Sequence, residues 1–178
     1  QAPRDLCLKK KYAQNGEKVM VHISNFRKVK RVEDVIQVFE QVKKQIPTKL
    51  ILVGDGPEKQ SIERLSKQLN LHHDVIPLGK VADPKEILGL ADLFILPSET
   101  ESFGLSALEA MAMKVPVIST NSGGLPEVNL EGKTGFLSNV GDIQDMSKNS
   151  LKLLKDPDLL EQFRQNAFSQ AMKFDIEK

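Results

Sequence analysis

The segment from Pro97 to Ala110 contains two glutamates, Glu101 and Glu109, whose spacing suits a ligand with two sugar rings. A helix is predicted to begin between them, and its rise of ~1.5 Å per residue separates the two carboxylates by roughly 10 Å. Carboxylates accept hydrogen bonds from hydroxyl groups, so each glutamate can hold one of two sugars that flank a diphosphate. Apolar residues surround Glu109, and a buried charge requires a partner. We therefore favour ligand binding over the alternative, in which Glu109 is a solvated helix residue and Glu101 a loop charge.

The residues between the two glutamates form a predicted anion site. Ser102 is a favourable N-cap residue, which leaves the backbone N–H groups of Phe103, Gly104 and Leu105 without helical partners. Free N–H groups and the helix dipole together favour an anion at this position. Gly104 has no side chain that would block a phosphate, so the segment predicts a phosphate-binding helix N-terminus.

Positive charge that suits a diphosphate is concentrated in residues 27–31. Four of these five residues are cations: Arg27, Lys28, Lys30 and Arg31. Arginine offers a bidentate fork to a phosphate, and lysine offers a mobile point charge. The alternative is a solvated start of a helix, but cations are unfavourable in the first turn of a helix because of its dipole. We therefore interpret the segment as a diphosphate-binding loop.

Two further turns are rich in glycine. Gly54 and Gly56 free the backbone for a tight turn and for close approach of a ligand, although this segment alone favours an ordinary strand-to-helix turn. They do not form the three-glycine fingerprint of dinucleotide-binding proteins, which argues against a nicotinamide dehydrogenase. The pair Gly123 and Gly124 either closes over a ligand or only caps the sheet, and both readings stay open.

These segments follow short apolar runs that are typical of buried strands. The runs are Val19–Ser24, Lys49–Val53, Asp74–Leu78, Leu93–Leu96, Pro116–Thr120 and Gly135–Leu137. They are continuous rather than alternating, as in strands that are covered on both faces. Amphipathic stretches lie between them, which predicts an α/β fold with a parallel sheet of about six strands and helices on both faces. Ligands of such sheets bind at the carboxyl ends of the strands, where the segments described above lie.

Helices are predicted from apolar residues at three- and four-residue steps and from proline near their starts. One apolar face comprises Val32, Val35, Ile36, Phe39, Val42 and Ile46, and a second comprises Leu105, Leu108, Met111 and Ala112. Pro57, Pro84 and Pro157 mark three further helix starts, and the last of these helices is expected to run towards Phe174.

Composition and cysteine usage exclude several classes of protein. The 178 residues contain 25 Lys and Arg against 24 Asp and Glu, and a net charge of +1 gives no overall attraction to nucleic acid or to an anionic membrane. Cys7 is the single cysteine, which excludes an internal disulfide and favours a reducing, cytoplasmic compartment. No apolar run approaches the ~18–20 residues that span a bilayer. The N-terminal segment has no signal-peptide pattern. The chain starts at Gln1 rather than at a methionine, so we expect a processed product or a fragment.

Metal and nucleophile chemistry find little support in the sequence. His72 and His73 are adjacent, so they point apart on a helix or strand and cannot chelate one metal. His22 lies in a predicted strand and is expected to be a core histidine with satisfied hydrogen bonds. Neither a cluster with metal-ligand spacing nor a nucleophile elbow is present.

Five motifs together resemble the C-terminal domain of the family-4 retaining glycosyltransferases, whose GT-B fold consists of two facing Rossmann-like domains. The motifs lie at residues 24–30, 53–58, 78–80, 101–112 and 123–127. The resemblance covers nearly the whole chain, and its most specific element is the pair of glutamates within Glu-Ser-Phe-Gly-Leu and the helix that follows. It implies that residues 1–178 are the nucleotide-sugar-binding half of a GT-B fold and that the N-terminal acceptor domain is absent from this chain.

The resemblance also implies roles for individual residues. Arg27 and Lys30 would bind the donor diphosphate and stabilise its charge as it leaves, and Glu101 would hold hydroxyls of the transferred sugar, which makes these three the predicted catalytic residues. Glu109 would hold the ribose hydroxyls. The other predicted nucleotide-sugar-binding residues are Asn25, Gly54, Gly56, Gly79, Lys80, Val81, Ser102, Phe103, Gly104 and Leu105.

Within this set, Gly104 and Leu105 would meet the phosphates through their backbone, and residues 79–81 would border the base. The basic loop departs from the commoner pattern of the family, in which the arginine stands five residues before the lysine. That position is Asn25 here, and Arg27 stands only three residues before Lys30.

The implied activity is transfer of a hexose-type sugar with retention of configuration and without a catalytic metal. The motifs at residues 24–32 and 98–105 look most similar to a branch of the family that transfers N-acetylglucosamine from UDP-N-acetylglucosamine to L-malate in bacillithiol biosynthesis. The implied partners are the sugar nucleotide and the chain's own N-terminal domain, without which the chain is expected to be inactive; a homo-oligomer stays open. A sugar-nucleotide 2-epimerase and a non-catalytic nucleotide-binding module are the alternatives.

Overall fold

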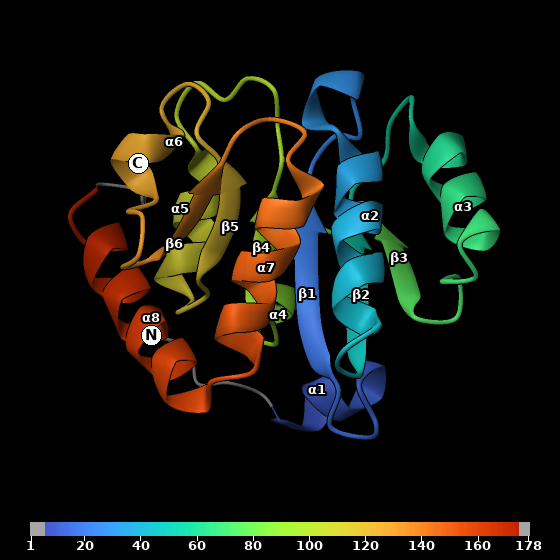
Figure 1. Cartoon of the computed structure of the whole chain (residues 1–178), viewed down its shortest axis with the longest axis horizontal. Coiled ribbons are helices and arrows are strands. Elements are labelled where there is room, and N and C mark those ends of the chain that lie inside the picture. The colour runs from blue at the N-terminus through green and yellow to red at the C-terminus, as the bar shows by residue number, and fades with distance from the viewer. Residues whose placement is uncertain (1–5, 175–178) are drawn as a thin grey trace.

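The computed structural model describes residues 6–174, and within them the strands form one six-stranded sheet (Figure 1). The strands are β1 (Lys18–Ile23), β2 (Thr48–Val53), β3 (Val75–Gly79), β4 (Leu93–Leu96), β5 (Val117–Thr120) and β6 (Gly135–Ser138). Their order is β3-β2-β1-β4-β5-β6, and every neighbouring pair is parallel. The predicted Rossmann-like α/β fold is confirmed, and each predicted strand is present with ends that differ by one residue at most.

Helices connect the strands and cover both faces of the sheet. They are α1 (Leu6–Tyr12), the 3-10 helix η1 (Lys28–Lys30), α2 (Val32–Lys43), α3 (Lys59–Gln68), α4 (Lys85–Leu88), α5 (Leu105–Ala112), α6 (Leu125–Val128), α7 (Ile143–Leu154) and α8 (Pro157–Ala171). Side chains alternate along β1, so Met20 belongs to the apolar cluster of α2 and α7, whereas Val19 and Val21 belong to that of α4 and α5. Figure 1 shows α2 and α7 side by side over one face. Coverage on both faces explains why the strand sequences are continuously apolar.

Helix α8 begins at Pro157 as predicted, and the Asp156 carboxylate caps it by accepting a hydrogen bond from the Leu159 N–H at 3.1 Å. Helices α3 and α4 begin at Lys59 and Lys85, within two residues after the prolines that predicted them. Proline thus marks the approach to each helix, and its exact position in the first turn varies.

A buried ionic cluster joins α1 and α8 to the amino end of β4. The Asp92 carboxylate lies 3.1 Å from Lys9 and 2.7 Å from Arg164, and it accepts a hydrogen bond from the Val19 N–H at 2.8 Å. Burial by itself raises the pKa of Asp92, but the charges of Lys9 and Arg164 hold it below the usual value. This cluster fixes the edge of the sheet opposite to the loops with the predicted site residues.

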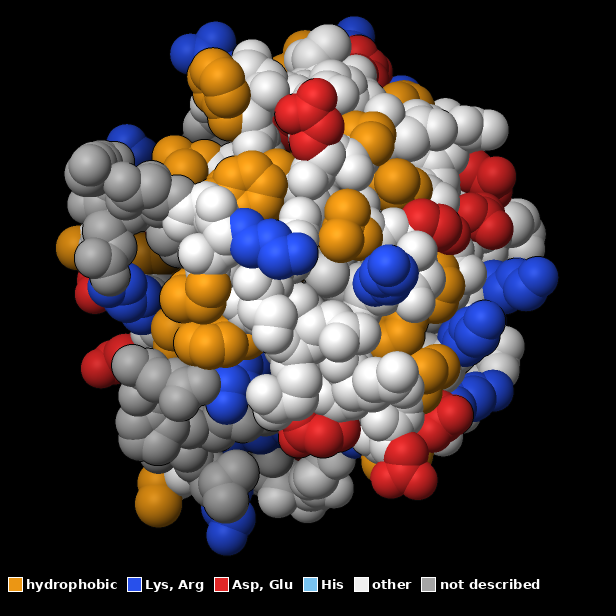
Figure 2. All heavy atoms as spheres, turned by 90° about the vertical axis from the view of Figure 1, so that its left-hand side faces the viewer, with side chains coloured by type: hydrophobic (Ala, Val, Ile, Leu, Met, Phe, Trp, Pro, Cys, Tyr) orange, Lys and Arg blue, Asp and Glu red, His pale blue; other side chains and the backbone are white. Residues whose placement is uncertain are grey.

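The surface of the chain mixes charges of both signs, in keeping with its net charge of +1. The side of the molecule drawn in Figure 2 shows hydrophobic, acidic and basic side chains interspersed. Within residues 6–174, no helix combines the length and the apolar character needed to cross a membrane.

Candidate functional site

The loops after β1 and β4 meet at the carboxyl edge of the sheet, where the strand order reverses. In the sheet β1 lies between β2 and β4. Strands β2 and β3 therefore lie on one side of β1, and strands β4, β5 and β6 lie on its other side. The two loops are joined by a hydrogen bond of 2.8 Å from the Glu99 N–H to the Val29 carbonyl. Ligands of open α/β sheets bind at such a switch point. The fold therefore brings the basic segment and the glutamate segment together.

Lys30 and Glu101, both predicted as catalytic residues, form an ion pair at this junction. The Lys30 ammonium lies 3.0 Å from one carboxylate oxygen of Glu101 and 3.5 Å from the other. The two side chains keep only 21% and 14% of their surface exposed, so solvent screens the pair less than it would screen a pair on the open surface. Held together here, the ammonium can bind a phosphate oxygen and the carboxylate can bind a sugar hydroxyl.

The cations of residues 27–31 precede α2, so they do not lie in its first turn, where the argument from the helix dipole had placed them. Lys28–Lys30 form η1, Arg31 adopts a left-handed conformation with φ of 50°, and α2 begins at Val32. The first turn of α2 carries Glu33 and Asp34 instead, which suit the helix dipole. The dipole therefore gives no reason for ligand binding here, and the concentration of positive charge remains as the reason.

These cations have different surroundings. Arg27 and Lys28 are exposed, whereas Arg31 donates hydrogen bonds to Asp34 at 2.7 Å and to Glu99 at 3.1 Å. The hydrogen bond to Asp34 raises the pKa of the Arg31 guanidinium. Arg31 therefore fastens the loop to α2 and to the segment after β4, while Arg27 and Lys28 stay open to an anion.

Gly54 and Gly56 are required by close contact between two loops. A Cβ atom at Gly54, where φ is +131°, would lie 1.8 Å from the Ser24 carbonyl oxygen. One at Gly56 would lie 1.8 Å from the carbonyl oxygen of Asn25, whose own side chain is exposed. The structure thus explains both glycines by packing of the β1 loop, and their contact with a sugar nucleotide stays a prediction.

The segment Gly79, Lys80 and Val81 lies at the end of β3, beside this turn. The Gly54 N–H donates to the Gly79 carbonyl at 2.8 Å. Gly79 has φ of +69° and open space where a Cβ atom would be, Lys80 is exposed, and Val81 packs half-buried against the core. Contact of residues 79–81 with a base stays a prediction.

Helix α5 begins two residues later than predicted. Its N-cap is Gly104 with φ of +63°, and Ser102 and Phe103 precede it as exposed residues. A Cβ atom at Gly104 would lie 3.0 Å from the Leu125 side chain of α6. Ser102 is therefore not the N-cap, because a left-handed turn packed against α6 sets the start of the helix. The free N–H groups are those of Gly104 and of residues 105–107, so two of the three predicted donors, Gly104 and Leu105, are among them.

Glu109 lies on an exposed face of α5, so the inference from a buried charge is wrong. Leu105, which was predicted to face the core, is 59% exposed, while Leu108 and Met111 are buried as predicted. Residues 105 and 109 are four positions apart and share one face of the helix. A ligand can therefore reach Glu109 without displacing a core side chain.

The turn at Gly123 and Gly124 packs on the backbone of Glu101. The Gly124 N–H donates to the Glu101 carbonyl at 2.9 Å, and a Cβ atom at Gly123, where φ is +54°, would lie 1.9 Å from the same oxygen. The neighbouring Thr120 hydroxyl donates to the Ser98 carbonyl at 2.7 Å. The turn thus supports the glutamate segment, a role that neither of its two predicted readings included.

His22 is a buried core histidine, as predicted. It is 0% exposed, its Nδ1 lies 2.8 Å from the Ile95 carbonyl oxygen, and its Nε2 lies 2.8 Å from the Ser24 hydroxyl. Burial lowers the pKa of His22 from 6.5 to about 4, so the ring is neutral near pH 7.

Acidification from pH 7 to pH 4.5 is expected to remove about 2–3 kcal/mol of unfolding free energy through His22. In this window the unfolded ring binds a proton and the folded ring does not, so the unfolded state is favoured as the pH falls. Urea unfolding at pH 7 and pH 4.5 should show this loss, and His22→Asn should reduce it. The exposed His72, changed to Asn, serves as the control and should leave the loss unchanged. Equal pH dependence in wild type and His22→Asn would contradict the prediction.

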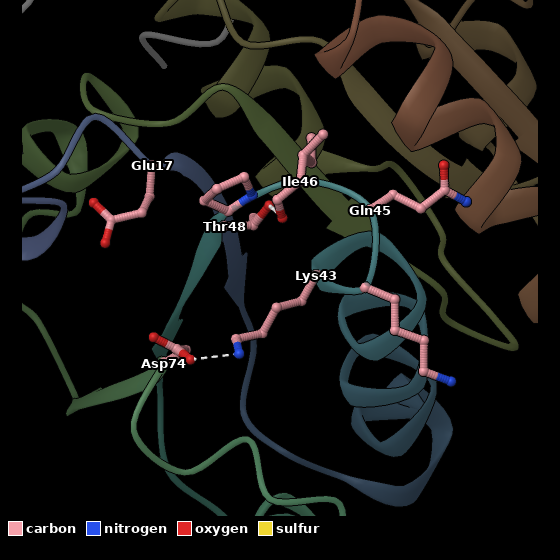
Figure 3. A pocket seen from close by; sticks show the side chains of 8 residues that line it. Glu17, Lys43, Gln45, Ile46, Thr48 and Asp74 are labelled. Atoms are coloured by element: carbon pink, nitrogen blue, oxygen red, sulfur yellow. Dashed lines mark hydrogen bonds and ion pairs between the residues drawn. The ribbon is translucent and has the colours of Figure 1, made fainter.

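Within residues 6–174, no group of three or more His, Cys, Asp or Glu side chains could hold a metal ion. A hollow of about 360 Å³ lies at the amino edge of the sheet, with Glu17, Lys43, Thr48 and Asp74 in its lining (Figure 3). Lys43 pairs with Asp74 at 2.8 Å, so these charges neutralise each other. The hollow lies at the end of the strands opposite to the predicted site residues and is not part of the candidate site.

Two residues that fasten the site, Ser24 and Glu99, were not predicted. Ser24 follows His22 by two positions, and residues two apart in a strand share a face, so that signal was available in the sequence. Glu99 binds Arg31 from 68 positions away, and no local pattern indicates such a contact.

Comparison with known proteins identifies the family and the fold of the chain. The family of group 1 glycosyl transferases matches residues 5–170 of the chain. Over 153 residues the chain is 50% identical to the N-acetyl-alpha-D-glucosaminyl L-malate synthase of Bacillus anthracis, an alignment that covers 85% of this chain and 40% of that protein.

Two solved structures have the same fold and contain UDP. A mutant of TarM from S. aureus, in complex with fondaparinux, alpha-GlcNAc-glycerol and UDP, matches with a TM-score of 0.86 and 29% identity over 90% of this chain and 33% of that one. HepE from Anabaena, in complex with UDP and glucose, matches with a TM-score of 0.88 and 27% identity over 99% of this chain and 50% of that one. The chain thus spans half or less of the length of these three proteins.

Proposed function

The chain belongs to the group 1 glycosyltransferases, and from that premise we propose that it is the nucleotide-sugar-binding C-terminal domain of a retaining glycosyltransferase with the GT-B fold. The observation that carries the proposal is the ion pair of Lys30 and Glu101 at the β1–β4 switch point. It joins a cation suited to a phosphate and a carboxylate suited to a sugar at the edge where α/β sheets bind ligands.

In this proposal the donor lies along the start of α5. Lys30 and Arg27 bind its diphosphate, and the N–H of Leu105 supports the same anion from the first turn of α5. Glu101 accepts hydrogen bonds from the transferred sugar. Glu109, on the exposed face of α5, accepts hydrogen bonds from the ribose hydroxyls, as the resemblance to the family implies. These assignments need no metal ion.

We further propose UDP-N-acetylglucosamine as donor and L-malate as acceptor, which places the enzyme in bacillithiol biosynthesis. The support is the name of the Bacillus anthracis relative, together with the UDP in the structures of TarM and HepE. The acceptor contacts are assigned to an N-terminal domain outside the 178 residues, which agrees with the 40% of the relative that the alignment covers. We therefore expect this chain alone, in the cytoplasm or in vitro, to bind the donor without transferring sugar.

Calorimetric titration of the chain with UDP tests the proposal. Wild type is expected to bind with a Kd in the micromolar-to-millimolar range, and Glu109→Ala should weaken binding by about 10–100-fold because hydrogen bonds to a charged acceptor are lost. Glu161→Ala, which removes an exposed glutamate from α8, is the matched control and should bind like wild type.

Failure of the folded wild-type chain to bind UDP, ADP or GDP would overturn the proposed nucleotide site. Equal affinities for wild type and Glu109→Ala would remove the ribose role from Glu109 and leave the site itself in place. Sugar transfer by the 178 residues alone would contradict the need for a second domain.

A further inference from the structure

The loop that carries the basic residues is attached to the sheet through His22. The imidazole is fully buried in β1, where Nδ1 faces the Ile95 carbonyl of β4 and Nε2 faces the Ser24 hydroxyl, each at 2.8 Å. The Phe26 N–H in turn donates to the Ser24 hydroxyl oxygen at 3.2 Å. These contacts form a continuous chain of hydrogen bonds from the centre of the sheet to the start of the loop.

The chemistry of the partners fixes the direction of each bond. A carbonyl oxygen only accepts, so Nδ1 carries the proton that faces Ile95. In the neutral ring Nε2 is then an acceptor, and the Ser24 hydroxyl must donate to it. This leaves the Ser24 lone pairs free to accept from the Phe26 N–H. The lowered pKa of His22, caused mainly by its burial, keeps the ring in this neutral state near pH 7.

This series of hydrogen bonds ends at Phe26, a strained residue next to the basic segment. Phe26 is 3% exposed and has φ of 48°, a left-handed conformation that is unfavourable for a residue with a side chain. Its carbonyl accepts a hydrogen bond from the Glu58 N–H at 3.0 Å, and its ring stacks near His22. Two anchors, His22 and Glu58, therefore hold the turn in this conformation.

The conformation of Phe26 sets the path of the residues that follow. Arg27 comes next, and its carbonyl accepts from the Lys30 N–H at 2.9 Å in the 3-10 turn. The Lys30 ammonium then reaches Glu101 at 3.0 Å. A change at Ser24 or Phe26 is therefore expected to displace Arg27 and Lys30, the two cations that were assigned to the diphosphate.

We propose that His22 is a positioning residue of the donor site, which as the Nδ1–H tautomer holds Ser24 and Phe26 and through them places Arg27 and Lys30. It contacts no substrate itself. The inference rests on the proposed function, because it assigns to His22 an effect on the affinity for the nucleotide diphosphate.

The test compares UDP affinity with folding in matched variants of the 178-residue chain. His22→Asn retains an amide donor for Ile95 but is too short to accept from Ser24, and Ser24→Ala removes the hydroxyl at the other end of the same bond. Each is expected to weaken UDP binding by about tenfold, the effect of one buried hydrogen bond. Ser24→Thr keeps a hydroxyl at this position, so its Kd for UDP should stay within about threefold of the wild-type value. The double variant should bind no more weakly than the weaker single variant, since both remove one interaction.

Titrations are run well below the unfolding temperature of each variant, so that a merely structural role would lower that temperature and leave the Kd unchanged. Wild-type Kd values in folded His22→Asn and Ser24→Ala would overturn the inference and leave the proposed function standing, whereas absence of UDP binding by wild type would overturn both. Nitrogen-15 NMR of His22 provides a test without nucleotide: a protonated Nδ1 and an unprotonated Nε2 at pH 7 are expected, and the opposite tautomer would overturn the inference.

Discussion

Replacing Lys30 with alanine in the complete enzyme is expected to lower kcat by about 100–1,000-fold, with a much smaller rise in donor KM. When the glycosidic bond breaks, negative charge develops on the departing diphosphate, and a positioned cation stabilises that charge more in the transition state than in the bound donor. The Lys30 ammonium is largely withdrawn from solvent beside Glu101, so water cannot readily replace it. Steady-state kinetics with the proposed substrates, UDP-N-acetylglucosamine and L-malate, with the product identified as transferred sugar rather than an epimer, provide the measurement.

The loss of Lys30 also leaves Glu101 without its partner, so a second variant must separate the two effects. If the unpaired carboxylate of Glu101 alone caused the defect, the double variant Lys30→Ala with Glu101→Gln would recover activity. We expect instead that the kcat of the double variant stays at or below that of Lys30→Ala. Lys148→Ala removes an exposed lysine of α7 and serves as the control for a change of one charge. An unchanged kcat in Lys30→Ala would remove this residue from the catalytic machinery.

The sheet could be predicted from the sequence because a strand that is buried on both faces consists of consecutive apolar residues. Leu93–Leu96 forms β4 as predicted, since four consecutive apolar residues have no exposed face to accommodate in a central strand. The strand ends varied by one residue because the loops contribute backbone hydrogen bonds of their own, as between Gly54 and Gly79. The carboxyl edge, and with it the place of the site, followed from the order of the elements.

The start of α5 could not be predicted because a tertiary contact decides it. Ser102 has the side chain of an N-cap residue, but Gly104 turns the chain in a left-handed conformation against Leu125, 21 positions further on. Along the helix that follows, Leu108 and Met111 pack into the core, and Leu105 and Glu109 lie on the exposed face. The types of the two glutamates and their separation of eight positions come from the sequence alone, and their contact with a ligand stays a prediction.

The sequence left open whether the glycines of the site loops make room for a ligand or only form turns, and in the structure three of them make room for a neighbouring segment of backbone. Gly54, Gly56 and Gly123 each lie where a Cβ atom would come within 2 Å of a backbone oxygen of another loop. Local sequence indicates that a glycine is permissive, but it does not indicate what approaches it. The loops of the site are thus braced against each other, so a change in one loop is transmitted to the next.

Gly123→Ala is expected to show this transmission most strongly. The new Cβ atom would lie 1.9 Å from the Glu101 carbonyl oxygen, a clash that only movement of the backbone can relieve. Strain of the left-handed conformation and overpacking together should lower the unfolding free energy by about 3–5 kcal/mol. The displaced Glu101 should lose its contact with Lys30, so UDP-sugar turnover by the complete enzyme should fall even at temperatures where the variant is folded.

Gly132→Ala separates the clash from the strain. Gly132 also has a left-handed conformation, with φ of +75° against +54° at Gly123, but no atom lies within 4 Å of the position of its Cβ atom. Its substitution should therefore lower the unfolding free energy by only about 1–2 kcal/mol and leave turnover intact. Urea unfolding and kinetics of both variants provide the comparison. If the two variants lose the same stability and both keep full turnover, the Gly123 turn does not hold Glu101 in place, and the bracing of one site loop by another has no part in catalysis.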